Sequence, residues 1–249
     1  MSRFKDKVVV VSGGNSGIGL ESVKGFLAEG AKVVFSGRRQ EALDAVSKEL
    51  SGDFKAVLAD QSKLEDNKKL VEVAVATYGT IDVLFVNAGV AYFVPADQID
   101  EQHFDSQFDI NVKGPAFLVK SAIPNLKDGA SIIFNTSIVH KKGFEASAVY
   151  SATKGALRAF ARVLTTELAP RKIRVNAVAP GPIATPIYNK LGMPEEVVNE
   201  MGQGFAASNP LKRFGDPKEV ANVVLFLASE EASYVNGAEL EVDGGVSQV

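Results

Sequence analysis

Short apolar runs rich in Val, Ile and Phe alternate with longer amphipathic segments along the chain. The short runs predict β-strands at residues 7–12, 32–36, 54–59, 82–86, 131–135, 174–177 and 239–242. The longer segments predict helices at residues 17–29, 40–50, 64–78, 101–126, 148–168 and 217–228. Most strand runs are continuously apolar rather than alternating, which is typical of strands covered by helices on both faces.

Repeated strand–helix units of this kind predict an α/β fold: a single-domain, Rossmann-type, doubly wound parallel sheet of about seven strands, flanked by helices on both faces. No linker, charge block or repeat divides the sequence. Residues 1–249 are therefore expected to form one dinucleotide-binding domain.

The segment between the sixth and seventh predicted strands interrupts the alternation, because prolines recur from residue 180 to residue 217. A long insertion of this kind usually carries function or moves, so we expect a substrate-binding loop or lid at about residues 182–216. A surface helix that packs its own apolar side is an equally good interpretation of its apolar residues. The candidates for an inner apolar face or a pocket wall are Tyr188, Leu191, Met201, Phe205, Leu211 and Phe214.

The composition narrows the function classes. The 249 residues are 46% hydrophobic and 23% charged, as in an ordinary soluble globular protein, and the net charge of −3 gives no basic footprint for nucleic acid or an anionic membrane. The absence of cysteine excludes disulfides, thiolate catalysis and Cys-ligated metals, and with two histidines no metal site is expected. No apolar run is long enough for a signal sequence or a membrane span, which predicts a cytoplasmic protein.

A glycine-rich segment, Ser12-Gly13-Gly14-Asn15-Ser16-Gly17-Ile18-Gly19, follows the first strand and opens a helix. Its glycines allow a tight turn and a close approach of the backbone to a pyrophosphate, which the amides and dipole of the helix N-terminus would bind. An ordinary glycine-rich turn is the alternative, but the position between a strand and a helix favours dinucleotide binding. The segment is not a P-loop, because no Gly-Lys-Ser/Thr follows.

The end of the second strand indicates which dinucleotide is bound. Folds that select NAD usually carry Asp or Glu there, on the ribose hydroxyls. This chain has Ser36-Gly37-Arg38-Arg39 instead. Arg38 or Arg39 could pair with a 2′-phosphate, although both could equally be solvated residues at a helix start. NADP(H) is therefore the favoured cofactor, and NAD(H) stays open as the alternative.

Candidate catalytic residues lie near the fifth strand and the helix after it. Tyr150 and Lys154 are four residues apart, so they project from one face of a helix. A nearby ammonium lowers the pKa of a phenol from about 10 towards useful acid–base chemistry. Ser137 ends the fifth strand, at the sheet edge where open α/β folds bind ligands, and its hydroxyl could hold a carbonyl oxygen beside the phenol. The Tyr-x-x-x-Lys pair alone is weak evidence, and its combination with Ser137 and the glycine-rich segment carries the interpretation.

In this combination the chain resembles the short-chain dehydrogenase/reductase family in its roughly 250-residue form, and it is similar to carbonyl reductases of the 3-oxoacyl-(acyl-carrier-protein) reductase type. The resemblance rests, in chain order, on residues 12–19, Asp60, Asn87-Ala88-Gly89, Asn111, Ser137, Tyr150, Lys154, Pro180-Gly181 and Val242-Asp243-Gly244-Gly245. Two positions depart from the family pattern. Ser12 replaces a threonine and keeps its hydroxyl, whereas Val86 replaces an asparagine and puts the local rigidity around the fourth strand in question.

The resemblance implies a role for each site residue. Tyr150 would be the general acid or base, Lys154 would lower its pKa and bind the nicotinamide ribose, Ser137 would orient the carbonyl, and Asn111 would position a water in a proton relay. Asp60 would contact the adenine, with a helix cap as its alternative, and a structural helix kink is the alternative for Asn111. Cofactor contacts are implied at Gly13, Asn15, Ser16, Gly17, Ile18, Gly19, Arg38, Arg39, Asp60, Gln61, Asn87, Ala88, Gly89, Tyr150, Lys154, Pro180, Gly181, Ile183 and Thr185.

The expected activity is that of an NAD(P)H-dependent alcohol dehydrogenase or carbonyl reductase (EC 1.1.1.-), which reduces ketones or aldehydes to alcohols reversibly. Three alternatives remain: a 3-oxoacyl-(acyl-carrier-protein) reductase, a sugar or steroid alcohol dehydrogenase, and, more remotely, a non-catalytic nucleotide sensor. An acidic carrier would need a basic rim, for which the candidates are Arg158, Arg162, Arg171 and Lys172. The run His140-Lys141-Lys142 is either solvated or contacts an anionic substrate group. The family resemblance further implies a homotetramer or homodimer that acts on a small-molecule substrate.

Overall fold

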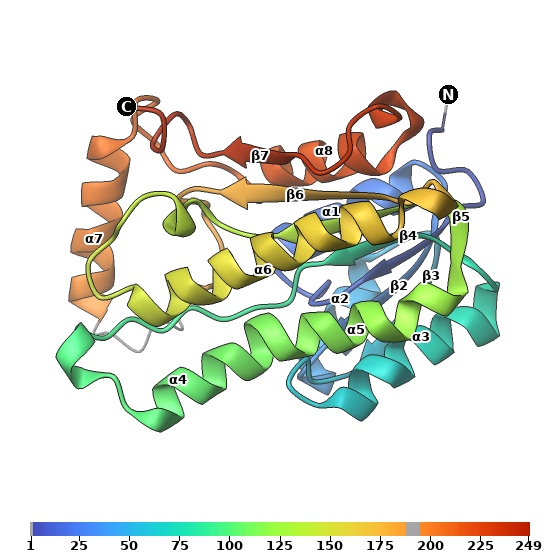
Figure 1. The fold of residues 1–249 in the computed structure, drawn as a ribbon, viewed down its shortest axis with the longest axis horizontal. Helices are drawn as coiled ribbons and strands as arrows, with labels where there is room; N and C mark the ends of the chain where they lie inside the picture. The colour runs from blue at the N-terminus through green and yellow to red at the C-terminus, as the bar shows by residue number, and fades with distance from the viewer. Residues whose placement is uncertain (1, 188–194) are drawn as a thin grey trace.

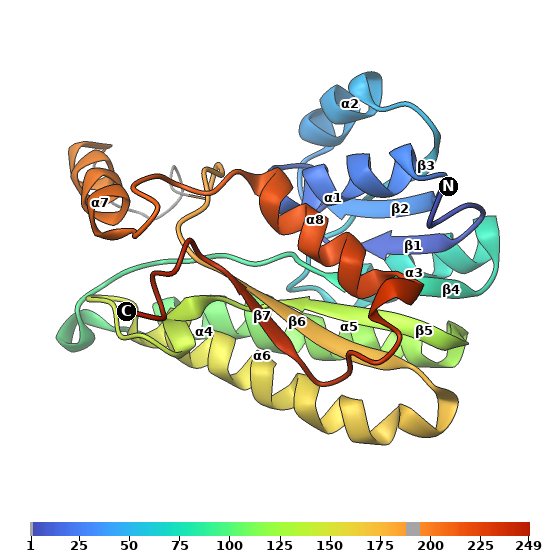
Figure 2. The same ribbon diagram turned by 90° about the horizontal axis from the view of Figure 1, so that it is seen from above.

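The structure is a computed structural model of the chain, and it describes residues 2–187 and 195–249. In these residues a sheet of seven parallel strands runs between two layers of helices (Figures 1 and 2). The strand order is β3-β2-β1-β4-β5-β6-β7. The strands are β1 (Val8–Val11), β2 (Lys32–Gly37), β3 (Asp53–Leu58), β4 (Ile81–Val86), β5 (Leu126–Asn135), β6 (Arg174–Pro180) and β7 (Glu239–Val242). The predicted fold class is confirmed.

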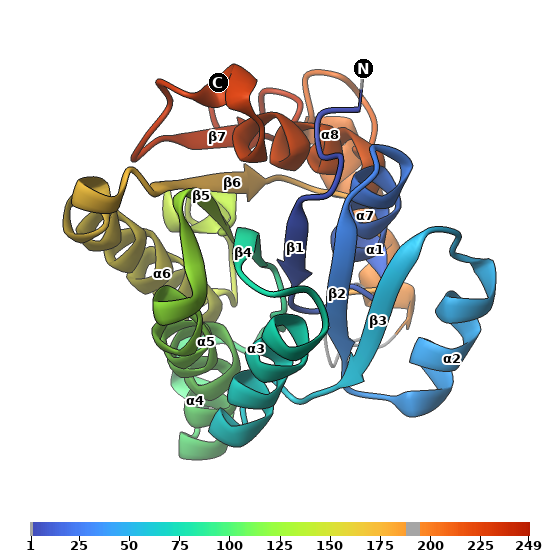
Figure 3. The same cartoon turned by 90° about the vertical axis from the view of Figure 1, so that its right-hand side faces the viewer.

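Each face of the sheet is covered by its own set of helices (Figure 3). One set consists of α1 (Gly17–Ala28), α2 (Gln40–Glu49) and α8 (Pro217–Ala228), and the other of α3 (Leu64–Tyr78), α4 (Glu101–Phe108), α5 (Gly114–Ala122) and α6 (Ala148–Glu167). The valines of β1 alternate between two hydrophobic cores, with Val9 and Val11 facing α1 and α8, and Val8 and Val10 facing α3 and α5. This two-sided burial explains why the strand runs are continuously apolar.

The strand order reverses at β1, which pairs with β2 on one side and with β4 on the other. The chain leaves these strands toward opposite faces of the sheet, so a crevice opens at their carboxyl ends, where open α/β sheets bind ligands. Helix α7 (Glu195–Ser208) lies beyond this edge of the sheet and stands away from the two layers (Figure 1).

The predicted helix at residues 101–126 is divided into two α-helices by a π-helical turn, Asp109–Lys113. Two residues after this turn account for the break. Pro115 has no backbone N–H, so it cannot donate to the carbonyl of Asn111 as an α-helix requires. Gly114 lies so close to a neighbouring loop that a Cβ there would be 2.1 Å from the carbonyl oxygen of Gln61. Isolated π-turns often mark functional positions.

Most predicted boundaries agree with the structure within one or two residues, and the exceptions are at α5, β5, β6 and α7. Helix α5 ends at Ala122, four residues before the predicted end. β5 begins five residues earlier than predicted, and β6 extends to Pro180. Helix α7 falls within the segment at residues 182–216, for which the sequence leaves both a lid and a surface helix open. Tyr188 and Leu191 lie outside the described residues.

Candidate active site

The glycine-rich segment forms the loop between β1 and α1, and its backbone requires glycine. Gly13 and Gly17 have φ angles of +67° and +53°, in the left-handed region that favours glycine. A Cβ on Gly19 would lie 2.1 Å from the carbonyl oxygen of Gly13. Ser16 is the N-cap of α1, and its side chain makes no cap hydrogen bond. No side chain of the N-cap occupies the first amides of α1, so these amides can bind an anion.

The loop after β4 is held rigidly against this glycine segment. The Ser12 hydroxyl accepts hydrogen bonds from the amides of Asn87 and Ala88, at 3.0 and 3.1 Å. The Asn87 side chain donates to the carbonyls of Ser12 and Gly13, both at 3.0 Å, and accepts from Asn135 at 2.9 Å. Val86 is buried in the core. The question raised by Val86 is thus answered, because Ser12 and Asn87 supply the bonds that fix this loop.

A groove of about 200 Å³ runs from the glycine segment along the ends of β2 and β4. Two buried polar atoms on its wall, Gln61 Nε2 and Asn135 Oδ1, have no hydrogen-bond partner among the described residues. Such orphaned atoms are costly unless a ligand or water satisfies them. The groove therefore fits a polar, phosphate-bearing dinucleotide. Of the predicted cofactor contacts, it is lined by Gly13, Asn15, Ser16, Gly17, Ile18, Gly19, Arg38, Arg39, Gln61, Asn87, Ala88, Gly89 and Thr185.

Arg38 and Arg39 line the groove where β2 ends, and both are exposed. No acidic residue is among the described residues that line this groove. Asp60 follows β3 but does not line the groove, because its carboxylate accepts hydrogen bonds from the amide and the hydroxyl of Ser62, at 2.9 and 2.8 Å. These bonds stabilise the turn after β3. Asp60 does not cap α3, whose N-cap is Lys63, so the helix-cap alternative is wrong.

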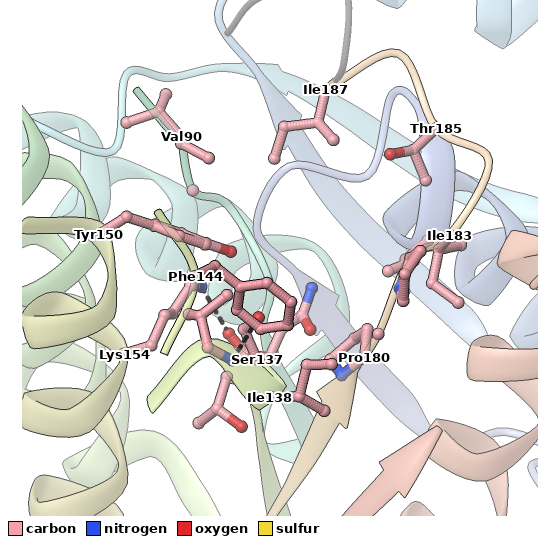
Figure 4. A pocket seen from close by; sticks show the side chains of 18 of the residues that line it. Val90, Ser137, Ile138, Phe144, Tyr150, Lys154, Pro180, Ile183, Thr185 and Ile187 are labelled. Carbon is pink, nitrogen blue, oxygen red and sulfur yellow. Dashed lines mark hydrogen bonds between the residues drawn. The ribbon is translucent and has the colours of Figure 1, made fainter. Parts of the chain in front are cut away.

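A second cavity, of about 180 Å³, continues from the groove and contains three of the four candidate catalytic residues (Figure 4). Tyr150 and Lys154 reach it from α6, and Ser137 reaches it from the end of β5. The Ser137 hydroxyl lies close enough to the Tyr150 phenol to favour the ionised form of that phenol. The structure therefore brings together the three residues that the sequence analysis combined. The opposite wall carries the predicted cofactor contacts Pro180, Gly181, Ile183 and Thr185.

The protein environment shifts the pKa values of both Tyr150 and Lys154, the titratable groups that α6 contributes to the cavity. Burial raises the pKa of the Tyr150 phenol to about 12, and the nearby Ser137 hydroxyl opposes this shift. Burial also lowers the pKa of the Lys154 ammonium to about 8. We expected Lys154 to lower the pKa of Tyr150, and in this structure the opposite direction holds, because desolvation of the phenolate dominates. Tyr150 is thus held as a neutral phenol that can donate a proton.

Asn111 lies in the π-helical turn and is almost fully buried. Its side chain exchanges two hydrogen bonds with the backbone of Val90, at 2.8 and 2.9 Å, and donates to the Thr153 hydroxyl at 3.1 Å. A Cβ on Gly89 would be 3.1 Å from Asn111 Oδ1 and 3.5 Å from Lys154 Nζ, so both groups border the same small space. The Lys154 ammonium donates to the carbonyl of Asn135 at 2.8 Å.

The rest of the cavity wall is mainly apolar. The Phe93 ring packs edge-on against Tyr150, with 6.0 Å between ring centres, and Phe144 packs edge-on against Phe205 of α7 at 5.8 Å. Figure 4 shows Phe144 and Ile138 beside the catalytic residues. The sequence analysis missed Phe93, Phe144 and Ile138. Residues 90–93 form an apolar run directly after Asn87-Ala88-Gly89, and that run was the available signal.

Several charged candidates lie elsewhere. His140 is neither solvated nor in the cavity, because its buried side chain faces Glu239 at 3.0 Å. Arg158 donates to the carbonyl of Gly237 at 2.8 Å. Arg171 bonds Asp128 and the Ile123 carbonyl, at the opposite end of the sheet from the cavity. Arg158 and Arg171 therefore do not form a rim around the cavity.

Among the residues predicted to form an inner apolar face of the segment at residues 182–216, Phe205 is confirmed and Leu211 is wrong. Phe205 lines the cavity, whereas Leu211 is 61% exposed.

None of the helices in residues 2–187 and 195–249 combines the length and apolar character needed to cross a membrane. In the same residues, no three His, Asp or Glu side chains gather closely enough to hold a metal ion.

Comparisons with known proteins extend over almost the whole chain. A family model described as enoyl-(acyl carrier protein) reductase matches residues 13–247. An uncharacterized oxidoreductase of Methylorubrum extorquens is 41% identical over 250 residues, which cover 99% of this chain and 100% of that protein. A crystal structure from Brucella melitensis, described as a short-chain dehydrogenase/reductase and glucose/ribitol dehydrogenase, is 35% identical with a TM-score of 0.92, covering 98% of both chains. The structure of levodione reductase is 31% identical with a TM-score of 0.93, covering 98% of this chain and 99% of that one.

Proposed function

The chain belongs to the short-chain dehydrogenase/reductase family of oxidoreductases, and from this premise we propose that it is an NADP(H)-dependent carbonyl reductase. It reduces neutral, apolar ketones or aldehydes to alcohols, and runs in reverse as an alcohol dehydrogenase. The observation that carries the proposal is the convergence of Ser137, Tyr150 and Lys154 in one cavity that continues into the glycine-lined groove.

The groove wall supports NADP(H) over NAD(H). Arg38 and Arg39 stand at the end of β2, where a carboxylate would bind the ribose hydroxyls of NAD and repel a 2′-phosphate. A guanidinium can instead form a paired hydrogen bond with that phosphate. The amides of the α1 N-terminus would hold the pyrophosphate, and Gln61 Nε2 and Asn135 Oδ1 would gain the partners that they lack among the described residues.

The cofactor supplies the hydride, and the residues of the chain supply the proton and the orientation. Ser137 donates a hydrogen bond to the carbonyl oxygen and holds it beside Tyr150. The Tyr150 phenol, kept protonated by burial, gives its proton to that oxygen as the negative charge develops. Lys154 and Asn111 border the space behind Tyr150, and a water held there would return a proton to the phenol. In alcohol oxidation the same proton moves in the opposite direction.

The apolar wall narrows the substrate class. Phe93, Phe144 and Phe205 offer ring faces and edges to a compact, ring-containing carbonyl compound. A sugar would leave many hydroxyls unpaired against such a wall. A carrier-bound acyl chain needs a basic rim, and neither Arg158 nor Arg171 is placed to form one. We propose that α7, which contributes Phe205, covers the substrate as part of the lid expected between β6 and β7.

Helix α5 continues α4 along one line, and α6 lies beside them (Figure 1). These helices carry partly exposed apolar residues. Phe104 is 43%, Phe117 36% and Val163 54% exposed. We propose that this face pairs two copies of the chain within a homotetramer, as the family resemblance implies. Light scattering on the purified protein tests the assembly, since a monomeric mass contradicts it.

The proposed activity is tested with a panel of carbonyl compounds that contains cyclic and aromatic ketones, small aliphatic ketones and aldose sugars. Each compound is assayed with NADPH and with NADH by following the absorbance of the reduced nicotinamide. We expect the highest kcat/KM for the apolar cyclic ketones with NADPH. Turnover of sugars alone would contradict the substrate class, and the absence of turnover with every compound would contradict the activity.

A further inference from the structure

A buried carboxylate lies behind the catalytic residues and outside the cavity. Glu239 is the first residue of the edge strand β7, and its side chain is only 3% exposed. A buried carboxylate is costly unless its oxygens are paired and hydrogen-bonded. Here both oxygens have partners. Oε1 accepts from the Thr136 hydroxyl at 2.6 Å, and Oε2 lies 3.0 Å from His140 Nε2, 3.0 Å from Lys141 Nζ and 3.5 Å from Arg158 Nε.

Three of these partners flank Ser137 in the sequence. Thr136 precedes it, and His140 and Lys141 end the short 3₁₀ turn that follows it. Ser137 is the N-cap of this turn, and its hydroxyl accepts from the Val139 amide at 3.4 Å. Glu239 therefore holds the chain on both sides of the serine from a single carboxylate.

The fourth partner belongs to the helix that carries Tyr150 and Lys154. Arg158 follows Lys154 by one helical turn, and its side chain is 11% exposed. It also donates to the carbonyl of Gly237, just before β7, at 2.8 Å. The same carboxylate thus lies between the Ser137 turn and α6, and its contact with Arg158 Nε is an ion pair rather than a hydrogen bond.

We propose that Glu239 is a positioning residue, which fixes the Ser137 hydroxyl relative to the Tyr150 phenol through Thr136, His140 and Arg158. This inference rests on the proposed function, since it assigns Ser137 and Tyr150 to one reaction. Glu239 touches neither substrate nor cofactor. Its effect is on geometry, where a displacement of about 1 Å can lower a rate by roughly a hundredfold.

Burial lowers the pKa of His140, and its Nε2 lies 3.0 Å from the Glu239 carboxylate. The neighbouring Glu241 offers a matched control. It lies two residues further along β7 and also pairs with Lys141, but within the described residues it forms no ion pair or hydrogen bond with Thr136, His140 or Arg158.

The test compares Glu239→Gln with Glu241→Gln in the full-length protein. For Glu239→Gln we expect kcat for ketone reduction to fall by roughly tenfold, with NADPH affinity within about twofold of the parent. Hydrogen exchange of the peptide amides in residues 136–142 should rise in Glu239→Gln, and Glu241→Gln should change neither quantity. If Glu239→Gln does not fold, Thr136→Val removes the contact to Oε1, together with the hydrogen bond to the Val178 carbonyl, and should lower kcat in the same direction.

The outcomes separate this inference from the proposed function. An active parent enzyme with unchanged kcat in Glu239→Gln overturns the positioning role alone. Equal effects of Glu239→Gln and Glu241→Gln also overturn it, because they would reflect a general loss of charge at β7. If the parent reduces no carbonyl compound, the proposed function fails, and the exchange measurement decides whether Glu239 holds the Ser137 turn: a selective rise supports the anchor and no rise removes it.

Discussion

Lys154 lies one helical turn after Tyr150, and its ammonium nitrogen is 5.7 Å from the centre of the tyrosine ring. Burial shifts the pKa values of the two groups in opposite directions. Burial raises the pKa of the phenol to about 12 and lowers that of the ammonium to about 8, so burial favours the neutral form of both. The pair therefore gives a neutral proton donor with a second titratable group close behind it.

Replacement of Tyr150 by phenylalanine tests the proton donor. Tyr150→Phe keeps the ring that Phe93 contacts and removes only the hydroxyl. We expect kcat to fall by about a thousandfold and the dissociation constant for NADPH to stay within about twofold. Stopped-flow reduction and fluorescence titration measure these two quantities. Tyr234→Phe, at a fully exposed tyrosine, is the control, and a Tyr150→Phe enzyme as active as this control would remove the phenol from the mechanism.

Stability should depend on pH through Lys154. Its pKa is about 8 in the folded protein and about 10.4 when unfolded. Between these values the unfolded chain holds the proton that the folded protein has released, so the stability of the parent rises with pH. Relative to Lys154→Met, the gain should reach about 3 kcal/mol by the upper end of this window. Urea unfolding at a series of pH values measures it, with Lys68→Met, at an exposed lysine, as the control. If the unfolding free energies of the parent and Lys154→Met changed with pH in parallel, the lowered pKa of Lys154 would be contradicted.

The 2′-phosphate proposal predicts a selective loss of affinity. Replacing Arg38 and Arg39 together by alanine removes both guanidinium groups and leaves the glycine loop intact. We expect NADPH to bind about a hundredfold more weakly, whereas NADH affinity changes by no more than about twofold. Isothermal titration calorimetry with both nucleotides measures the ratio of the NADPH and NADH dissociation constants. Lys48→Ala, at the far end of α2, serves as the control, and equal losses for the two nucleotides would show that the arginines do not bind the phosphate.

The local parts of the site were predictable from the sequence, because each lies within one short segment. The glycine loop and the Tyr150–Lys154 pair depend on spacing within a turn, and the alternation of strands and helices specified the parallel sheet. The division of the helix at residues 101–126 also had a local cause, Gly114-Pro115, which the periodicity analysis did not weigh. The bounds of helix α7 could not be predicted because Gly202 and Gly204 interrupt its apolar pattern, and the segment fits a lid and a surface helix equally well.

Contacts between distant segments could not be predicted in the same way. The environment of Glu239 arises only when β7 pairs with β6 and faces α6, which brings it to Thr136 and Arg158. His140 was therefore interpreted as a surface or substrate-binding residue, although it is buried against Glu239. The direction of the Tyr150 pKa shift also depended on burial, which the helical spacing of Tyr150 and Lys154 does not reveal.

The aromatic wall should determine substrate preference. Phe144→Ala removes the ring that packs against Phe205 and opens the apolar side of the cavity. We expect kcat/KM for a cyclic ketone to fall by at least about tenfold, because a lost apolar contact of this size weakens binding to that degree. Acetone, which is too small to reach both rings, should be affected much less and provides the internal control. Equal losses for the two ketones would place Phe144 outside the substrate contacts.

Two glycine-to-alanine substitutions with opposite surroundings test the phosphate loop. In Gly19→Ala the new Cβ would meet the Gly13 carbonyl oxygen at 2.1 Å and Asn87 Nδ2 at 2.5 Å, so the loop must move. We expect a loss of about 1–3 kcal/mol in unfolding free energy and a marked loss of NADPH affinity. In Gly204→Ala the Cβ meets nothing within 4 Å among the described residues, and the better helix propensity should stabilise the protein by about 0.5–1 kcal/mol. Denaturant unfolding and nucleotide titration measure both variants. A Gly19→Ala protein that binds NADPH like the parent would show that the backbone of this loop does not need its close approach to Gly13.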